Sequence, residues 1–335
     1  INTLTSILTI LPAGLSNDLL KSKHLISFAL ILLGLGYLGI SFTHHFPLIM
    51  VLFFIQGIGQ TIYYSSSDSL FYRSANKENV SKKISIFHGL NYLMIGLGII
   101  VAGFLREMNL GFEQIFQIVA FGFFTMSLIS QVALPENITT KLNFIKYKKD
   151  ILKPKVLYFL LIMFLFSIHY GAESTTYGLF LKKELQLSSS QIGIYMGTAI
   201  ITMSVAVVLI GKYLHKIKVK YVLLSGLFIS GSGHILMTLK PALLSQTFRI
   251  YHEIGDAAMF FFLYYGISKL FDLKRIGGNA SIFTLTTTLG GAIGAMIFGP
   301  LGEKLGYSYP LIISGGSSLI AFIFALQFIH HFDHS

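Results

Sequence analysis

Residues 156–168 read VLYFLLIMFLFSI, a run of mostly apolar side chains with no regular alternation of polar and apolar positions. A strand of a membrane barrel alternates the two kinds over about ten residues, so this run predicts a helix. Apolar residues continue toward residue 181, and about 20 residues of helix cross a hydrocarbon core of about 30 Å. The stretch therefore predicts a membrane-spanning helix and an all-α fold.

Runs of the same kind recur along the chain and set the number of helices. The predicted spans are 1–19, 24–43, 47–71, 83–106, 112–134, 156–181, 189–214, 219–239, 242–270, 277–301 and 308–331. The mean hydropathy of +0.71, with 53% hydrophobic and 12% charged residues, is typical of a chain that is solvated by lipid. We therefore expect a polytopic membrane protein with eleven visible helices.

The positive charges are spread over short loops. The formal net charge is +11, but nineteen of the 25 Lys and Arg residues lie in the loops that follow residues 19, 71, 134, 214 and 270. This alternation is the positive-inside pattern, which places those loops in the cytoplasm. We expect a multi-pass protein of the cell membrane, plasma or inner, that contacts the lipid bilayer and binds no nucleic acid.

The chain shows an internal duplication. Its landmarks coincide at offsets of 197 and 196 residues, where Gly14 meets Gly211, Lys21 meets Lys218, Gly59 meets Gly255, and Ser85-Ile86-Phe87 meets Ser281-Ile282-Phe283. A repeat of this length predicts two pseudo-symmetric bundles, residues 1–134 and residues 156–335. The helix that begins near residue 156 has no counterpart in the first copy, so we expect one helix to be missing before residue 1.

The segment 135–155 is predicted to be a cytoplasmic linker between the two bundles. It is polar and rich in lysine, and it falls where one copy ends and the next begins. A second interpretation stays open for residues 142–149, which also suit an amphipathic helix on anionic lipid headgroups.

One loop carries the most specific local signal. Residues 14–23 read GLSNDLLKSK, with Gly14 four residues before Asp18 and lysines at the end, and residues 211–220 repeat the glycine and the bases. The pair resembles the cytoplasmic loop motif of the major facilitator superfamily, and the resemblance covers essentially the whole chain. It implies two six-helix bundles, and a gating role for Asp18, Lys23 and Lys220. A solvated aspartate without a gating role is the alternative for Asp18.

The helix predicted over 242–270 carries four ionisable side chains on one face. Arg249, His252, Glu253 and Asp256 fall within an arc of about 100° on a helix. Asp256 lies about 21 Å along the span, at a depth where a lipid-facing charge costs several kcal/mol. The stripe is therefore expected to face a cavity and to bind protons or substrate. Internal pairing of Arg249 with Glu253 and of His252 with Asp256 is the alternative.

Polar residues on other predicted helices are further candidates for binding substrate or protons. His169, Tyr170 and Glu173 lie together on the helix over 156–181, and a simple interfacial role is the alternative for Glu173. The matching stripe of the first half is uncharged. That first-half set consists of Gln56, Gln60, Tyr63, His88 and Asn91. Hydrogen bonding to a polar substrate is one interpretation of this set, and contacts between helices are the other.

These features favour secondary active transport of a small organic solute by alternating access, as symport or antiport with protons as the coupling ion. A receptor or scaffold that keeps the transporter fold without transport is the alternative. An enzyme is not expected, since the sequence shows no nucleophile elbow, metal-ligand spacing or catalytic carboxylate pair.

No cofactor and no metal site are expected, and the protein is expected to be a monomer. The chain has no cysteine, which excludes disulfides and thiolate metal ligands. The tail residues His330, His331 and His334 are interpreted as a solvated tail.

Overall fold

The structure is built from helices. The computed structural model describes residues 1–75, 79–136, 139 and 141–327. These residues form helices joined by short turns, and no strand occurs among them. The predicted all-α class is confirmed. The tail histidines lie outside the described residues.

Contacts within the chain divide it into two compact units. Unit 1 consists of Ile1–Asn76, Asn109–Lys153 and Leu270–Thr288, and unit 2 consists of Lys77–Met108, Pro154–Lys269 and Leu289–Ser335. These units cut across the predicted halves, because one early helix belongs to unit 2 and the start of one late helix belongs to unit 1. The division into an N-terminal and a C-terminal bundle stays a prediction.

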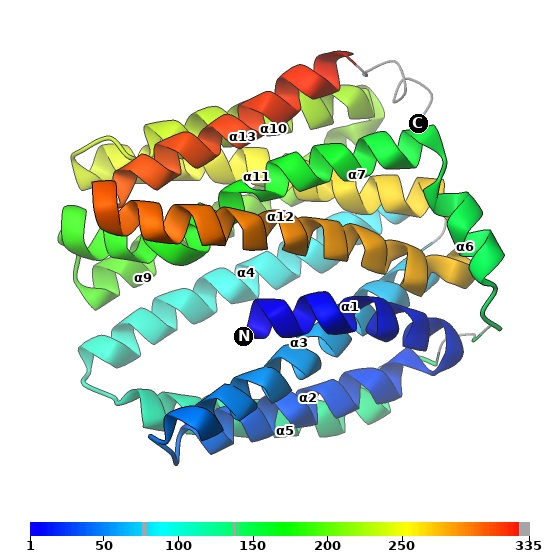
Figure 1. Cartoon of the computed structure of the whole chain (residues 1–335), viewed down its shortest axis with the longest axis horizontal. Helices are drawn as coiled ribbons and strands as arrows, with labels where there is room; N and C mark the ends of the chain where they lie inside the picture. The colour runs from blue at the N-terminus through cyan, green and yellow to red at the C-terminus, as the bar shows by residue number, and fades with distance from the viewer. Residues whose placement is uncertain (76–78, 137–138, 140, 328–335) are drawn as a thin grey trace. The chain divides into compact units, whose positions relative to one another are not determined.

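Unit 1 holds the loop motif. Its elements are α1 (Asn2–Leu19), α2 (Ser22–Ile40), α3 (Phe46–Ser74), α5 (Phe112–Ala133), α6 (Phe144–Ile151), η4 (Leu273–Arg275) and the first part of α12 (Ile276–Leu305). In Figure 1, α2 lies beside α3 and α5, and α1 packs on α3. The hydroxyls of Ser27 and Ser127 lie 2.8 Å apart and link α2 to α5, a polar contact of the kind that joins helices in lipid.

Unit 2 holds the ionisable stripe. Its elements are α4 (Val80–Glu107), α7 (Pro154–Ser167), α8 (His169–Ala172), η1 (Glu173–Tyr177), η2 (Phe180–Glu184), α9 (Ser189–Tyr213), η3 (Leu214–Lys216), α10 (Val219–Leu236), α11 (Ala242–Leu270), the remainder of α12, and α13 (Ser308–Gln327). Two helix pairs, α4 with α9 and α10 with α13, make its most extensive contacts.

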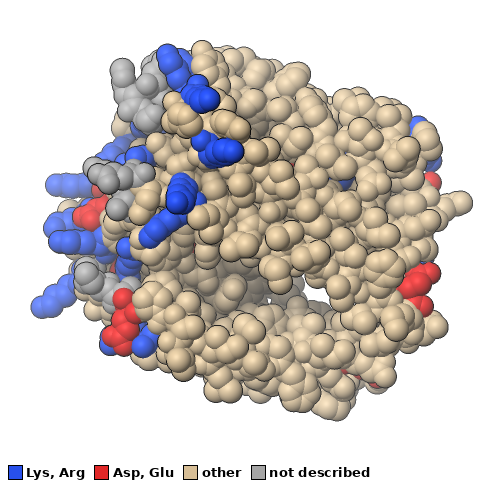
Figure 2. All heavy atoms as spheres, turned by 180° about the vertical axis from the view of Figure 1, so that it is seen from behind, with Lys and Arg blue, Asp and Glu red and all other residues tan. Residues whose placement is uncertain are grey.

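The helices have the length and composition of membrane spans. In the described part of the chain, nine are long and apolar enough to cross a membrane. The other two predicted spans, α1 and α11, are helical over 18 and 29 residues but are not among the nine. Polar side chains lower their hydropathy, and in α11 these include Arg249, Glu253 and Asp256. On the face in Figure 2, most of the visible surface carries no Lys, Arg, Asp or Glu side chain.

The predicted helix over 156–181 is irregular. It is α-helical to Ser167, α8 adds one more turn, and the backbone then widens into the π-helical turns η1 and η2. Turns of this kind change the direction in which side chains point, and they occur often at functional sites. Here the first wide turn begins at Glu173, one of the predicted site residues.

Candidate functional site

The ionisable stripe of α11 is buried inside unit 2. Arg249, His252, Glu253 and Asp256 expose between 0% and 4% of their surface. Two residues of the irregular helix over 156–181, His169 and Glu173, contact them through the ion pairs described below. We call this set, together with His234 of α10, the buried ionic cluster. The structure thus brings together most of the charged residues that the sequence singled out.

Arg249 bridges two carboxylates. Its Nη1 atom forms a close ion pair with Glu173 Oε1, and its Nη2 atom lies 2.5 Å from Glu253 Oε1. The guanidinium also lies over the ring of Tyr177, 4.6 Å from the centroid. The predicted pair of Arg249 with Glu253 is therefore present. The contact with Glu173 is a long-range addition that helical spacing cannot predict.

The histidines surround the same carboxylates. His252 Nε2 lies 3.2 Å from Glu173 Oε1 and 3.6 Å from Asp256 Oδ1, so the predicted proximity of His252 and Asp256 is also present. His169 Nε2 lies 3.5 Å from Asp256 Oδ2. His234 Nδ1 lies 3.6 Å from Glu173 Oε1. Sequence reasoning missed His234, because no charged residue lies near it in the sequence to mark it.

Two glycines bring α10 and α11 together at this point. A Cβ atom on Gly255 would lie 2.2 Å from the backbone nitrogen of Ser230, and one on Gly233 would lie 2.7 Å from Cα of His252. Because these glycines have no side chain, the backbones of α10 and α11 approach closely, and Ser230 of α10 can reach the charged face of α11. Its hydroxyl donates to Asp256 Oδ1 over 2.6 Å, and its carbonyl oxygen lies 2.8 Å from His252 Nδ1.

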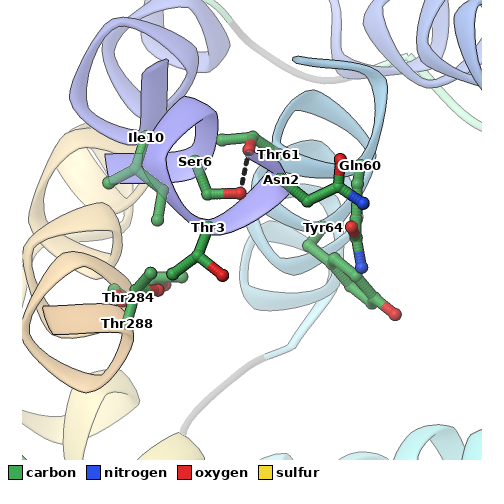
Figure 3. A pocket seen from close by; sticks show the side chains of 9 residues that line it. All are labelled: Asn2, Thr3, Ser6, Ile10, Gln60, Thr61, Tyr64, Thr284 and Thr288. Atoms are coloured by element: carbon green, nitrogen blue, oxygen red, sulfur yellow. Dashed lines mark hydrogen bonds between the residues drawn. The ribbon is translucent and has the colours of Figure 1, made fainter. Parts of the chain in front are cut away.

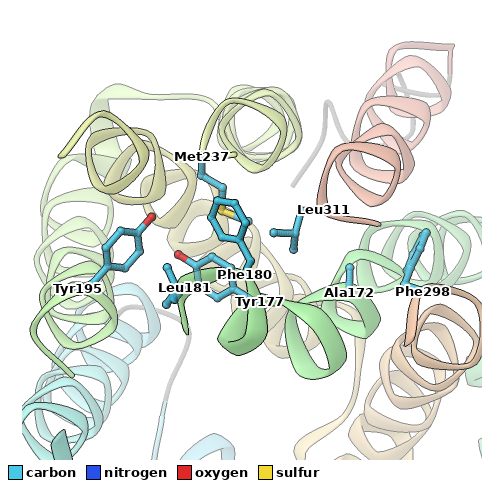
Figure 4. Close-up of a cluster of buried hydrophobic side chains, with 8 residues drawn as sticks. All are labelled: Ala172, Tyr177, Phe180, Leu181, Tyr195, Met237, Phe298 and Leu311. Carbon is cyan, nitrogen blue, oxygen red and sulfur yellow. The ribbon is translucent and has the colours of Figure 1, made fainter. Parts of the chain in front are cut away.

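An apolar cluster lies beside the buried ionic cluster. Figure 4 shows its members, which are Ala172, Tyr177, Phe180, Leu181, Tyr195, Met237, Phe298 and Leu311. Tyr177 belongs to both environments, since its ring packs in this core and also contacts Arg249. An apolar wall strengthens the nearby electrostatic interactions, because it excludes water from one side of them.

The predicted polar residues of the first half are dispersed. Gln56 is buried against Gly36 in unit 1, and Tyr63 contacts the ring of Tyr64. In unit 2, His88 is buried against Tyr264, with ring centroids 3.8 Å apart, and Asn91 is exposed. The ring of Tyr170, a predicted site residue of the helix over 156–181, lies tilted against that of His169, and its buried hydroxyl has no hydrogen-bond partner among the described residues.

Gln60 lines a polar cavity in unit 1 (Figure 3). The cavity has a volume of about 240 Å³ and lies among α1, α3 and α12. Its lining residues are Asn2, Thr3, Ser6, Ile10, Gln60, Thr61, Tyr64, Thr284 and Thr288. These side chains offer hydroxyls and amides but no formal charge. Apart from Gln60, sequence reasoning missed all of them, because Ser and Thr are common inside helices of membrane proteins.

Asp18 is a buried hub in unit 1. Its carboxylate accepts hydrogen bonds from Arg73 Nη2 at 2.5 Å, the Tyr147 hydroxyl at 2.7 Å, and the backbone N–H groups of Gly277 and Gly278 at 3.1 and 2.9 Å. The last two groups begin α12, where the helix dipole favours a negative charge. Asp18 has no exposed surface and is therefore not a solvated aspartate, whereas its gating role stays a prediction.

The linker helix α6 completes this hub. Burial raises the pKa of the Tyr147 phenol, and the hydrogen bond to Asp18 adds to the shift. Burial opposes the charge of Asp150, but hydrogen bonds from Arg275, Asn279 and Lys153 outweigh that effect and hold its pKa below the ordinary value. Residues 144–151 thus form an anchored helix within the predicted linker.

The two predicted gating lysines make surface contacts. Lys23 Nζ lies 2.9 Å from Glu136, which also pairs with Lys21. Hydrogen bonds from these two lysines lower the pKa of Glu136 to about 2. Lys220 lies over the ring of Tyr221, 5.7 Å from the centroid.

The chain matches the model of a known protein family. The family model described as Major Facilitator Superfamily matches residues 1–218 and 163–333. No curated protein sequence matches the chain significantly.

Solved structures share its fold. The crystal structure of the human organic anion transporter MFSD10 (TETRAN) is 16% identical with a TM-score of 0.77, over 96% of this chain and 82% of that one. The E. coli fucose:proton symporter FucP is 13% identical with a TM-score of 0.69, over 95% of this chain and 86% of that one. The structure of FucP in the outward conformation is 13% identical with a TM-score of 0.66, over 96% of this chain and 86% of that one. At such identities the likeness shows the fold alone.

Proposed function

Since the chain belongs to the Major Facilitator Superfamily, and the solved structures similar to it are transporters and not enzymes, we propose that it moves a small organic solute across a membrane by alternating access. The observation that carries this proposal is the buried ionic cluster. Arg249, Glu253 and Asp256 lie in one helix of a multi-pass membrane protein, with 2–4% of their surface exposed. Ionisable groups inside a membrane domain are costly, and they commonly mark a path for ions or substrate.

The solute is a polar organic molecule. MFSD10 is named an organic anion transporter, and FucP is named for fucose. Both names support a small organic substrate. The cavity of unit 1 presents uncharged hydroxyl and amide groups, which suit the hydrogen-bonding part of such a molecule. A monomer in the cell membrane is the proposed working form.

Protons are the coupling ion in this proposal. FucP, which shares the fold, is named a proton symporter, and that name supports the same ion for this chain. The coupling proposal concerns the ion and does not depend on which side chain carries it.

Asp18 is the proposed gating residue. Its carboxylate connects α1 to donors on α3, α6 and α12, so these elements cannot separate without exchanging several buried hydrogen bonds. Lys23 and Lys220 remain predicted helpers, since their visible contacts are with exposed neighbours.

Counterflow in liposomes tests the proposal. The reconstituted protein is screened with radiolabelled sugars, organic acids and amino acids, and a pH gradient is then imposed with and without a protonophore. Arg249→Gln is expected to abolish counterflow, because it leaves Glu173 and Glu253 without their shared partner. Thr247→Ala, on the exposed face of the same helix, is the matched control and should keep it.

Three results would contradict parts of this proposal. Counterflow that persists in Arg249→Gln would show that the buried ionic cluster is not part of the transport path. Flux that does not change with the pH gradient would exclude protons as the coupling ion. Thermal stabilisation by a solute without any flux would favour the receptor alternative.

A further inference from the structure

Three histidines and one glutamate converge inside unit 2. One ligand atom from each of His169, Glu173, His234 and His252 lies within 4.8 Å of every other. The imidazoles come from α8, α10 and α11, and none of the three has exposed surface. From this convergence we infer a binding site for one divalent transition-metal ion, which the sequence did not predict.

The histidine rings are oriented as metal ligands are. In each ring one nitrogen contacts an oxygen outside the cluster, which fixes the ring and leaves the other nitrogen for a metal. These outer contacts are His169 Nδ1 to the Phe166 carbonyl at 2.5 Å, His234 Nε2 to the Ser314 hydroxyl at 3.0 Å, and His252 Nδ1 to the Ser230 carbonyl at 2.8 Å.

The remaining ring nitrogens point into the cluster, where each faces a carboxylate oxygen at 3.2–3.6 Å without the geometry of a hydrogen bond. They are Nε2 of His169, Nδ1 of His234 and Nε2 of His252, and none has a hydrogen-bond partner within the described ranges. A buried polar atom that makes no hydrogen bond is costly and calls for an explanation, such as an ion that binds there. Three such histidines, whose ligand atoms lie within 4.8 Å of one another and of Glu173, favour a single shared ligand.

The spacing of the ligand atoms suits a four-coordinate ion. Zinc bonds of about 2.0 Å in a tetrahedron place the ligand atoms about 3.3 Å apart. Glu173 Oε1 lies 3.2 Å from His252 Nε2 and 3.6 Å from His234 Nδ1. Two edges of the tetrahedron therefore already have nearly the required length, and the other ligand atoms, which lie within 4.8 Å of one another, must move closer by up to about 1.5 Å to complete it.

The charge of the cluster also favours a divalent cation. Glu173, Glu253 and Asp256 supply three carboxylates, and Arg249 supplies one guanidinium. With neutral imidazoles the formal charge is −2, which a single divalent cation cancels. Arg249 would share Glu173 with the ion while it keeps its ion pair with Glu253, so the arginine need not leave.

The ligand types indicate which ions fit. Imidazole nitrogens with one carboxylate suit Zn²⁺ and its neighbours such as Co²⁺, whereas Mg²⁺ and Ca²⁺ prefer oxygen ligands. The Glu173 side chain keeps 19% of its surface exposed, which offers a route for the ion. The site does not depend on the proposed transport, since it is defined by binding alone.

Metal titration of the purified protein tests the inference. The starting variant has His330, His331 and His334 replaced by alanine, so that the tail does not bind metal, and it carries no histidine tag. After chelator treatment, Zn²⁺ is expected to bind with one ion per chain. Co²⁺ is expected to give the intense visible absorption of a four-coordinate ion, and Zn²⁺ should remove it by displacement.

Three variants of the same protein connect the ion to the cluster. His234→Ala should remove the cobalt spectrum. Ser314→Ala, which only frees the His234 ring, should weaken Zn²⁺ binding by about 10–100-fold. His88→Ala is the matched control, because His88 is also a buried histidine of unit 2 but contacts Tyr264 instead of the cluster.

Binding of less than one ion per chain to the folded starting variant would overturn the inference. The same conclusion follows if the cobalt spectrum persists in His234→Ala, or if Ser314→Ala and His88→Ala bind Zn²⁺ equally well. Thermal unfolding without metal shows which variants are folded, and the Ser314→Ala comparison stays decisive if His234→Ala is not.

Discussion

Replacing Asp18 by asparagine tests the buried hub of unit 1. The change removes the negative charge that Arg73 contacts at 2.5 Å, where the Arg73 side chain is only 10% exposed. Loss of one partner from a buried ion pair costs about 3–5 kcal/mol. Arg73 keeps its hydrogen bond to the Asn17 carbonyl, and asparagine can still accept from Gly277 or Gly278, so both effects reduce the cost. We therefore expect a loss near the lower end, about 3 kcal/mol.

A double-mutant cycle measures the interaction directly. Unfolding in detergent is followed for Asp18→Asn, Arg73→Gln and the double variant. The coupling free energy should be about 1.5–3 kcal/mol, the range for a hydrogen bond to a charged group. Asp272→Asn is the control, because Asp272 is 45% exposed and pairs with Arg275 at 3.2 Å. Its cost should stay within about 1 kcal/mol.

Additive effects of Asp18→Asn and Arg73→Gln would refute the reasoning. They would mean that the two side chains act separately and that the hub does not hold α1 to α3. A cost for Asp18→Asn equal to that of Asp272→Asn would lead to the same conclusion.

Two further predictions concern packing and pH. Gly255→Ala should lower the free energy of unfolding by about 1–3 kcal/mol, because the new Cβ would lie 2.2 Å from the backbone of α10. Gly316→Ala, which meets nothing within 4 Å, should be neutral or stabilising, and equal effects of the two changes in thermal unfolding would contradict the packing argument. Asp150 has a lowered pKa in the folded state, so its stabilising effect is present above the ordinary carboxyl pKa of about 4 and is lost as the pH falls below it. Asp150→Asn should therefore be less stable than the wild type at pH 7, the difference should shrink as the pH falls below about 4, and a constant difference between pH 7 and acid would exclude the linkage.

Local pattern was sufficient to predict the helices. Within the residues that the structure describes, each of the eleven predicted spans coincides with helical structure, because an uninterrupted apolar run in lipid must satisfy its backbone hydrogen bonds internally. The face shared by Arg249, His252, Glu253 and Asp256 follows from helical periodicity alone, and so does the spacing of the two internal pairs. These features depend only on residues within a few turns of one another.

Contacts between distant segments were not predictable in the same way. His234 joins the cluster from α10, and Tyr147 reaches Asp18 from the linker helix, but neither residue has a local partner that marks it. The π-helical turns at Glu173 also left no periodic signal in the apolar run that precedes them. In each case a side chain from another helix, or a change in helical pitch, decides the outcome.

The sequence by itself determined an all-helical membrane protein, its spans, its family resemblance and the polar face of α11. Only the tertiary structure decided that Glu173 contacts Arg249 and the imidazoles of His234 and His252 at once, and that His169 turns its Nε2 atom toward Asp256 beside them. The physical reason is range: hydropathy and helical period act between neighbours in the chain. The approach of α10 to α11 depends on glycines at Gly233 and Gly255, whose effect appears only when the helices are packed.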